Sequence, residues 1–266
     1  MPEWRFHPSI LAAILLCCLI GTGKAEAADR TVILSFAESN APYAWVSNGQ
    51  VQGLELDIIT TALALAGYRL EAAPRPYRRL AKVLEAERID GITGQRLDEL
   101  PGYYYSDPYM HYDNYAIVRQ DSGLALRSVG DLLAHNVVAW RGAAESLGLS
   151  RLEPDRFAAA NEKSYLEFAD QPMTFRYFWN HRADVLVSDK YIYETYLREH
   201  PDSAKNIPPV TYLRIFPEHQ VRVAFKSREV RDAFDQGFRA FQEGGGYQRL
   251  LDRYFSPQPA SLSRSN

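Results

Sequence analysis

The hydrophobic positions of this chain alternate between a period typical of strands and a period typical of amphipathic helices. Residues 31–36 are rich in β-branched and large apolar side chains, which predicts a strand. Residues 54–66 repeat apolar side chains on one helical stripe and are followed by Gly67, a residue suited to a helix C-terminus. The pattern then predicts strands over 68–72 and 89–93 and a helix over 77–87.

The alternation restarts after Asp131. It predicts strands over 137–140, 185–187 and 221–225, and helices over 143–149, 175–180 and from Ser188, a plausible N-cap, through 198. Apolar residues at helical spacing over 230–241 predict a last core-facing helix. Two successive strand–helix units predict an α/β fold of two lobes joined by more than one crossing. Ligands of open α/β sheets bind beyond the C-terminal strand ends, so the cleft between the lobes is the expected site.

The N-terminus has the order of a secretory signal. Arg5 and His7 precede an apolar run over 10–20, and Ala25-Glu26-Ala27 offers a cleavage site, so we expect a signal peptide over 1–27. The run is shorter than the about 20 residues that span a bilayer, although an uncleaved membrane anchor stays an alternative. The expected location is therefore the periplasm, and residues 258–266 are expected to be a disordered tail.

Both cysteines, Cys17 and Cys18, lie within the apolar run. The residues before them, Leu16 and Cys17, are not the small residue that lipid attachment favours. The mature chain would have no cysteine, which excludes disulfides, thiol catalysis and cysteine metal sites. Export without disulfides fits a bacterial periplasm.

Composition narrows the function further. The formal net charge of the 266 residues is only −3, so no overall basic field favours nucleic acid. The six histidines lack the i, i+4 spacing of a helical metal site, and neither a G-x-S-x-G elbow nor a P-loop is present. We expect no metal and no cofactor, and a monomer that binds a small molecule.

Four segments, in order along the chain, resemble the bacterial extracellular solute-binding proteins of the polar amino-acid type (family 3), the periplasmic components of ABC importers. The segments are Gly53-Leu54-Glu55-Leu56-Asp57-Ile58, Asp90-Gly91-Ile92-Thr93, Tyr105-Ser106-Asp107-Pro108-Tyr109 and Gly246-Tyr247-Gln248-Arg249-Leu250-Leu251 with Tyr254-Phe255. The resemblance implies a periplasmic-binding-protein-like fold whose lobes close around an amino acid or a derivative. It places lobe 1 over 28–119 and 219–257, lobe 2 over 120–218, and the crossings near 118–123 and 213–219.

In lobe 1 the resemblance places the ligand loop at Thr93, Gly94, Gln95 and Arg96. Arg96 could grip a carboxylate bidentately, or it could be an ordinary solvated arginine. The family's arginine lies further along a Thr-x-x-Arg segment, so this chain departs from the pattern here.

In lobe 2 the family offers Gly-Thr and a helix N-terminus. Here Trp140, Arg141, Gly142 and Glu145 surround that position, where backbone N–H groups form an anion seat. Ala144 replaces the family's hydroxyl residue, and Arg141 could compensate.

Asp189 matches the family position whose carboxylate meets the ligand's ammonium. It could equally be an acid stabilised by the N-terminus of the following helix. Tyr43 and Trp45, in a segment similar to the family's Ala-Pro-Phe, would stack on the ligand or belong to the core of lobe 1. Tyr77 is a further candidate at the edge of the cleft, for which packing is the simpler role.

Two other functions share this fold. Periplasmic cyclohexadienyl dehydratases resemble it, and Glu38 or Glu145 could then donate a proton. The same domain also serves some sensor kinases, so a ligand-sensing role beside a membrane partner is the third alternative.

Overall fold

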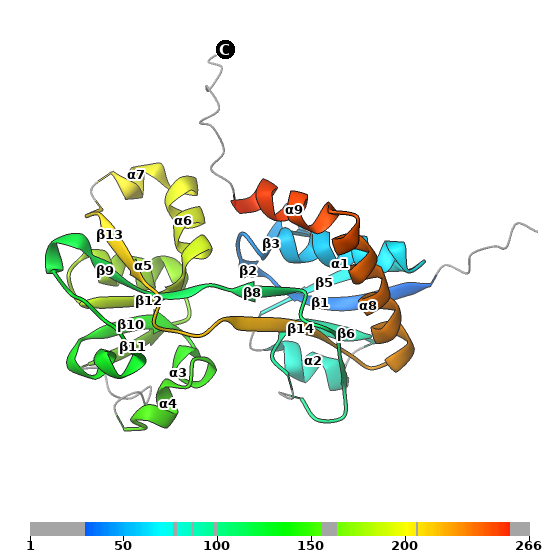
Figure 1. Ribbon diagram of the computed structural model, residues 1–266, viewed down its shortest axis with the longest axis horizontal. Helices are drawn as coiled ribbons and strands as arrows, with labels where there is room; N and C mark the ends of the chain where they lie inside the picture. Colours follow the sequence, from blue (N-terminus) through cyan, green and yellow to red (C-terminus); the bar gives the residue numbers. More distant parts are fainter. Residues whose placement is uncertain are drawn as a thin grey trace, which may run out of the picture.

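The computed structural model describes residues 30–76, 79–86, 88–97, 100–155, 164–205 and 207–255. Within these ranges the chain folds into two α/β lobes side by side, connected by two extended crossings (Figure 1). The expected signal peptide, both cysteines, Tyr77 and the C-terminal tail lie outside the described residues. No helix in the described part is both long and apolar enough to cross a bilayer.

Lobe 1 is built on a six-stranded mixed sheet with the order β5-β1-β6-β14-β7 and with β8 beside β14. β5, β1 and β6 run parallel, whereas β14 is antiparallel to its neighbours. The strands are β1 (Thr31–Ala37), β5 (Arg69–Arg75), β6 (Gly91–Gln95), β7 (Tyr104–Tyr105), β8 (Met110–Tyr112) and β14 (His219–Phe225). A small sheet of β2 (Ser39–Asn40), β3 (Ala44–Ser47) and β4 (Gln50–Gln52) completes the strands of this lobe.

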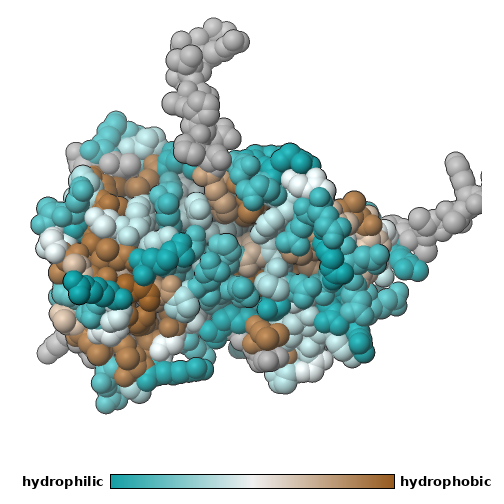
Figure 2. Space-filling model, in the orientation of Figure 1, coloured by the Kyte–Doolittle hydropathy of each residue, from teal (hydrophilic) through white to brown (hydrophobic). Residues whose placement is uncertain are grey.

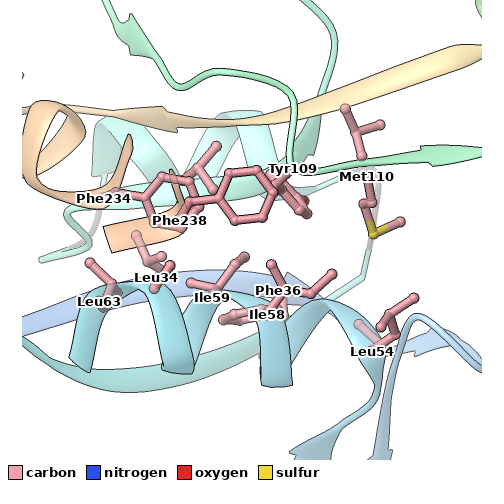
Figure 3. Close-up of a cluster of buried hydrophobic side chains, with 14 of the residues drawn as sticks. Leu34, Phe36, Leu54, Ile58, Ile59, Leu63, Tyr109, Met110, Phe234 and Phe238 are labelled. Carbon is pink, nitrogen blue, oxygen red and sulfur yellow. The ribbon is translucent and has the colours of Figure 1, made fainter. Parts of the chain in front are cut away.

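The main core of lobe 1 lies between this sheet and three helices: α1 (Leu54–Leu65), α8 (Arg228–Glu243) and α9 (Gly246–Phe255). Ile58 and Ile59 point from α1 toward Tyr109, Phe234 and the neighbouring aromatic rings (Figure 3). The apolar stripe predicted over 230–241 therefore belongs to the core. A smaller cluster beneath α2 (Leu80–Ala86) covers part of the other side of the sheet.

Lobe 2 has a five-stranded sheet with the order β11-β10-β12-β9-β13. Its strands are β9 (Asn114–Arg119), β10 (Val137–Trp140), β11 (Tyr165–Phe168), β12 (Val185–Asp189) and β13 (Val210–Leu213). Its helices are α3 (Ala143–Ser146), α4 (Leu149–Leu152), α5 (Gln171–Trp179), α6 (Lys190–Glu199) and α7 (Pro201–Ala204), with 3-10 turns η2 (Gln120–Ser122) and η3 (Val129–Ala134).

Successive residues of β10 face opposite sides of this sheet, and both sides are covered. Val137 and Ala139 belong to one buried cluster and Val138 to another. A strand buried on both faces has consecutive apolar residues, and this is why the strand over 137–140 could be predicted from the sequence. The fold class predicted from the alternation, two α/β lobes of the periplasmic-binding-protein type, is confirmed.

The first crossing lies earlier than the resemblance suggested. β9 pairs with β12 and β13 in lobe 2, so the chain leaves lobe 1 at Asp113, before the expected 118–123. The second crossing runs over 214–218, between β13 and β14. The polar and apolar residues of 103–115 gave no sign of this boundary because strand pairing is set by distant residues.

Two local features of lobe 2 also differ from the sequence expectation. The helix expected over 143–149 is divided into α3 and α4 by Gly148, whose φ is 74°. The N-cap of α6 is Asp189 rather than Ser188, because the Asp189 side chain accepts hydrogen bonds from the first backbone N–H groups of the helix.

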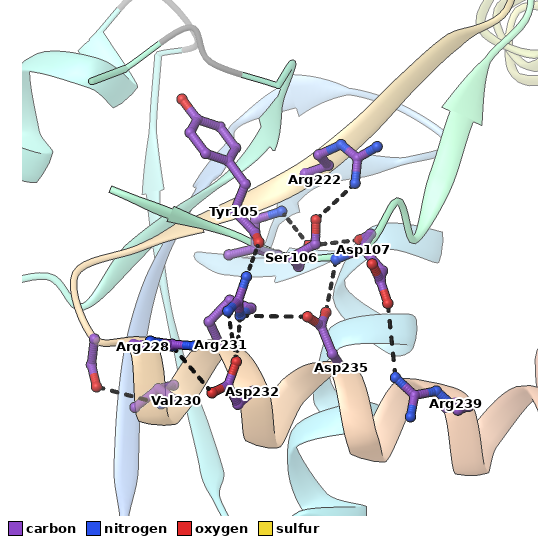
Figure 4. A network of polar contacts seen from close by, with 12 residues as sticks. Tyr105, Ser106, Asp107, Arg222, Arg228, Val230, Arg231, Asp232, Asp235 and Arg239 are labelled. Atoms are coloured by element: carbon purple, nitrogen blue, oxygen red, sulfur yellow. Dashed lines mark hydrogen bonds and ion pairs between the residues drawn. The ribbon is translucent and has the colours of Figure 1, made fainter. Parts of the chain in front are cut away.

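The Tyr105–Tyr109 segment holds α8 against the sheet of lobe 1 (Figure 4). The Ser106 hydroxyl accepts the Val223 N–H at 3.0 Å, and Arg222 donates to the Ser106 carbonyl at 2.9 Å. Asp235 of α8 accepts the Asp107 N–H at 2.8 Å and lies 3.6 Å from Arg231. In this chain, the segment that resembles the family pattern therefore has a structural role, because it links β14 to α8.

Candidate ligand-binding cleft

A cavity of about 440 Å³ lies between the two lobes, within the size range of small-molecule sites. Residues of both lobes form its wall, including some that adjoin the crossings. They are Ala37, Glu38, Ser39, Asn40, Pro76, Arg79, Tyr112, Asn114, Trp140, Arg141, Ala169, Gln171, Ser188, Asp189, Ile192 and His219. On the face drawn in Figure 2, hydrophilic side chains cover most of the middle of the molecule, where the lobes meet.

The topology explains why these residues meet. Glu38 directly follows β1, Arg141 directly follows β10, and Asp189 ends β12. Because the carboxyl ends of parallel strands lie at one edge of a sheet, each lobe turns that edge toward the other. Tyr112 ends β8 and His219 begins β14, so both lie in lobe 1 next to the crossings, and their rings are 5.9 Å apart.

Asp189 is held from three separate segments. Its carboxylate accepts the Tyr191 and Ile192 N–H groups at 2.9 and 3.0 Å, and the Asp113 N–H at 2.6 Å. The Tyr43 hydroxyl of lobe 1 lies 3.1 and 3.0 Å from its two oxygens. Four donors fill the roughly four lone-pair positions of a carboxylate. Asp189 is thus an N-cap and a contact between the lobes.

Burial dominates the electrostatics of Asp189. It raises the pKa of the carboxyl to about 7, against the opposing effect of hydrogen bonds from Ile192, Asp113 and Tyr43. Burial also raises the pKa of the Tyr43 hydroxyl, followed in effect by the nearby charge of Asp189. Tyr43 therefore stays a hydrogen-bond donor at neutral pH.

Tyr43 belongs to the buried core of lobe 1, and its hydroxyl contacts Asp189 in the cavity wall. Its ring packs edge-on against Tyr112 at 4.8 Å. Trp45 lies on β3, half-buried, and is not among the described residues that line the cavity.

The anion seat expected in lobe 2 is filled by the chain itself. The Gly142 and Ala144 N–H groups donate to Glu167 at 2.7 and 2.9 Å, and the Tyr165 hydroxyl donates to the same carboxylate at 2.7 Å. Parallel pairing of β10 with β11 places Glu167 there. A ligand carboxylate would have to displace it.

The predicted ligand loop of lobe 1 lies beside the cavity rather than in its wall. Thr93 and Gln95 are buried, and the Gln95 amide donates to the Thr93 carbonyl at 2.8 Å. Arg96 reaches across to lobe 2, where its guanidinium donates to the Ser146 carbonyl at 2.7 Å. Arg96 thus forms a second contact between the lobes.

Of the residues predicted for lobe 2, Trp140, Arg141 and Asp189 line the cavity. Glu145 is exposed on α3, and neither it nor Gly142 is among the described lining residues.

The buried side chain of Glu55 forms hydrogen bonds behind the cavity wall. Glu55 of α1 accepts a hydrogen bond from the Tyr109 hydroxyl, which in turn accepts the Gly94 N–H at 2.9 Å. Burial raises the pKa of Glu55 to about 7, and the hydrogen bond from Tyr109 opposes the rise. This chain of contacts fixes the end of β6 next to Tyr112.

The raised pKa of Glu55 makes a testable difference to stability. Because the folded protein binds this proton more tightly than the unfolded chain, its stabilising effect is present at low pH and is lost as pH rises from about 4.5 to 7. We expect the free energy of unfolding, relative to a Glu55→Gln variant, to fall by roughly 2 kcal/mol between pH 5 and 7.5. Urea denaturation of both proteins at the two pH values measures it. A constant difference between them would contradict the shift.

Sequence reasoning did not select Ser39, Asn40, Arg79, Gln171 or His219 as ligand residues, and considered Glu38 only as a proton donor. Most of these follow the carboxyl end of a strand in their lobe, which is the signal that could have found them. Among the described residues, no cluster of three His, Cys, Asp or Glu side chains could hold a metal ion.

The match to a family model agrees with this geometry. Residues 32–257 match the model of the bacterial extracellular solute-binding proteins, family 3. Among curated protein sequences, none matches the chain.

Solved structures with the same fold are numerous but distant in sequence. The arginine-, lysine-, histidine-binding protein ArtJ from Geobacillus stearothermophilus is 17% identical, with a TM-score of 0.65 over 87% of this chain and 97% of its own. A histidine kinase sensor domain with similarity to periplasmic binding proteins is 16% identical, with a TM-score of 0.70 over 86% and 97%. The ancestral amino acid-binding protein AncCDT-1, a precursor of cyclohexadienyl dehydratase, is 17% identical, with a TM-score of 0.66 over 85% and 95%. At these identities the likeness shows the fold alone.

Proposed function

The chain belongs to family 3 of the bacterial extracellular solute-binding proteins, and we propose that it binds a small polar solute, an amino acid or a derivative, between its lobes. The observation that carries this proposal is the cavity of about 440 Å³ whose wall is formed by residues of both lobes. A solute held there is contacted from two sides, so its binding free energy favours the arrangement in which the lobes are together.

The contacts between the lobes support hinged closure. Arg96 donates to the Ser146 carbonyl, and Tyr43 donates to Asp189, so each lobe presents polar partners to the other. The two crossings are the only described links along the chain between the two sheets, which suits a hinge. We further propose that the protein works as a monomer in the periplasm after cleavage near Ala27, and that it delivers its solute to an ABC importer.

A solute screen tests the proposal. Protein produced with its native N-terminus is unfolded, stripped of bound solute and refolded, and its thermal midpoint is measured with amino acids, amines and small organic acids. At a solute concentration 100 times the Kd we expect about 2.7 kcal/mol of added stability. For a protein of this size that corresponds to a rise of roughly 5–10 °C in the midpoint. An unchanged midpoint with every solute would contradict the proposal.

Catalysis is the second candidate, favoured by one position. Of the two acids that a dehydratase could use, Glu38 lines the cavity. Incubation with cyclohexadienyl substrates distinguishes the two functions, because a binding protein takes up at most one equivalent whereas an enzyme consumes the substrate repeatedly.

A further inference from the structure

Some charged side chains that line the cavity already have hydrogen-bond partners within the protein, whereas others have none. Among the described lining residues, four have a carboxyl or guanidinium side chain: Glu38 and Arg79 from lobe 1, and Arg141 and Asp189 from lobe 2. The Asp189 carboxylate already accepts four donors from the chain and is 3% exposed. It therefore has no lone pair left for a ligand ammonium unless the contact between the lobes breaks.

The backbone groups that could hold a ligand carboxylate are also occupied. Glu167 accepts the N–H groups of Gly142 and Ala144, and Tyr165 holds the same carboxylate in place. Displacing Glu167 would leave its carboxylate partly buried without these donors, which is costly. A ligand carboxylate would therefore have to find its partners elsewhere in the cavity.

The other three charged side chains are free to bind. Within the part of the chain that the structure describes, the side chains of Glu38, Arg79 and Arg141 have no hydrogen-bond or ion-pair partner, and all three residues are exposed. Among the described lining residues, the free charges are therefore two guanidinium groups and one carboxylate. Their complement is a solute with two anionic groups and one cationic group.

The two arginines come from opposite lobes. Arg79 lies at the start of α2 in lobe 1, and Arg141 follows β10 in lobe 2. Without an anion between the lobes their like charges disfavour close approach, whereas a solute with two carboxylates lets each lobe bind one of them. Anion binding would thus favour closure directly.

Resting on the proposed function, we infer that the solute is an amino dicarboxylate, an acidic amino acid or an N-carboxyalkyl amino acid. Its carboxylates bind Arg79 and Arg141, and its ammonium binds Glu38. Trp140 and Tyr112 line the same cavity and supply apolar contact for the carbon skeleton. Glu167 acts as a specificity residue because it closes the backbone seat to a ligand carboxylate.

Calorimetric titration of the refolded protein tests this recognition scheme. L-Aspartate, L-glutamate and an N-carboxyalkyl amino acid are compared with L-arginine and L-glutamine. We expect an amino dicarboxylate to bind most tightly, and Arg79→Gln or Arg141→Gln to weaken that binding by about 10- to 100-fold. The matched controls Arg88→Gln in lobe 1 and Arg151→Gln in lobe 2 change exposed arginines outside the cavity wall and should stay within about twofold.

Glu38 is tested with two solutes that differ by one ammonium group. We expect the protein to bind L-glutamate more tightly than glutarate. In the Glu38→Gln variant the ratio of the two Kd values should fall about tenfold. Tighter binding of L-arginine or L-glutamine than of every amino dicarboxylate would overturn the inference and leave the proposed function standing. Absence of binding by all of these solutes, together with an unchanged midpoint in the wider screen, would contradict the proposed function itself.

Discussion

Replacing Asp189 by alanine is expected to lower the free energy of unfolding by about 4 kcal/mol and to loosen the contact between the lobes. The variant loses the N-cap of α6, a loss worth about 1 kcal/mol. It also leaves the Asp113 N–H and the Tyr43 hydroxyl without their acceptor in a buried position. Urea denaturation measures the loss, with attention to whether the two lobes still unfold together.

Asp170 offers a matched control for the capping part of this effect. It is the N-cap of α5 and accepts the Met173 N–H at 3.2 Å, but it is exposed and belongs to lobe 2 alone. We expect Asp170→Ala to cost about 1 kcal/mol. A Tyr43→Phe variant removes only the hydroxyl contact with Asp189. If Asp189→Ala costs no more than Asp170→Ala, the interpretation of Asp189 as a contact between the lobes is wrong.

The features of this protein that could be predicted from sequence are those encoded by neighbouring residues. Val137–Trp140 and residues 185–187 are apolar runs of strand length, and the residues that follow them, including Arg141 and Asp189, are identified by position alone. This is why Trp140, Arg141 and Asp189 were predicted as ligand residues, and in the structure these three residues line the cavity.

What could not be predicted is which groups those residues meet. The donors to Asp189 come from Tyr43, from Asp113 and from the start of α6, and only the folded chain brings these segments together. Glu167 lies on a four-residue strand whose pattern is too short to be recognised, and its contact with Gly142 depends on the parallel register of β10 and β11. The backbone N–H groups that could bind an anion were therefore predictable from the sequence, but the Glu167 carboxylate that accepts them was not.

Arg96 illustrates the same limit for a charged side chain. Its position just after β6 was correct for a residue at the edge of a lobe, and both a ligand and solvent were reasonable partners. In the structure its guanidinium donates to Ser146 of the other lobe. A long flexible side chain can reach several partners from one backbone position, so the sequence places the charge but does not choose among them.

Replacing Gly53 by alanine is expected to destabilise the protein by at least about 4 kcal/mol and to displace Tyr43 from Asp189. Gly53 precedes α1 with φ 126° and ψ 172°, a conformation that side chains rarely adopt. A Cβ atom there would lie 2.2 Å from the Tyr43 carbonyl oxygen. That carbonyl accepts the Glu55 N–H at 2.9 Å. Because α1 has no side-chain cap, the nearness of the Tyr43 backbone to Gly53 gives an N–H group of the first helical turn its acceptor.

The Gly53→Ala substitution should therefore perturb both the start of α1 and the cleft. Gly49→Ala is the control for the strain that a positive φ alone causes. Gly49 also has a positive φ, 78°, but nothing lies within 4 Å of its Cβ position. We expect that variant to cost only about 1–2 kcal/mol and to leave solute binding unchanged. Gly53→Ala should weaken solute binding as well, because Tyr43 and Asp189 together hold the two lobes at the cavity. Equal losses of stability in the two variants would mean that the approach of Tyr43 to α1 contributes nothing to the fold or to the cleft.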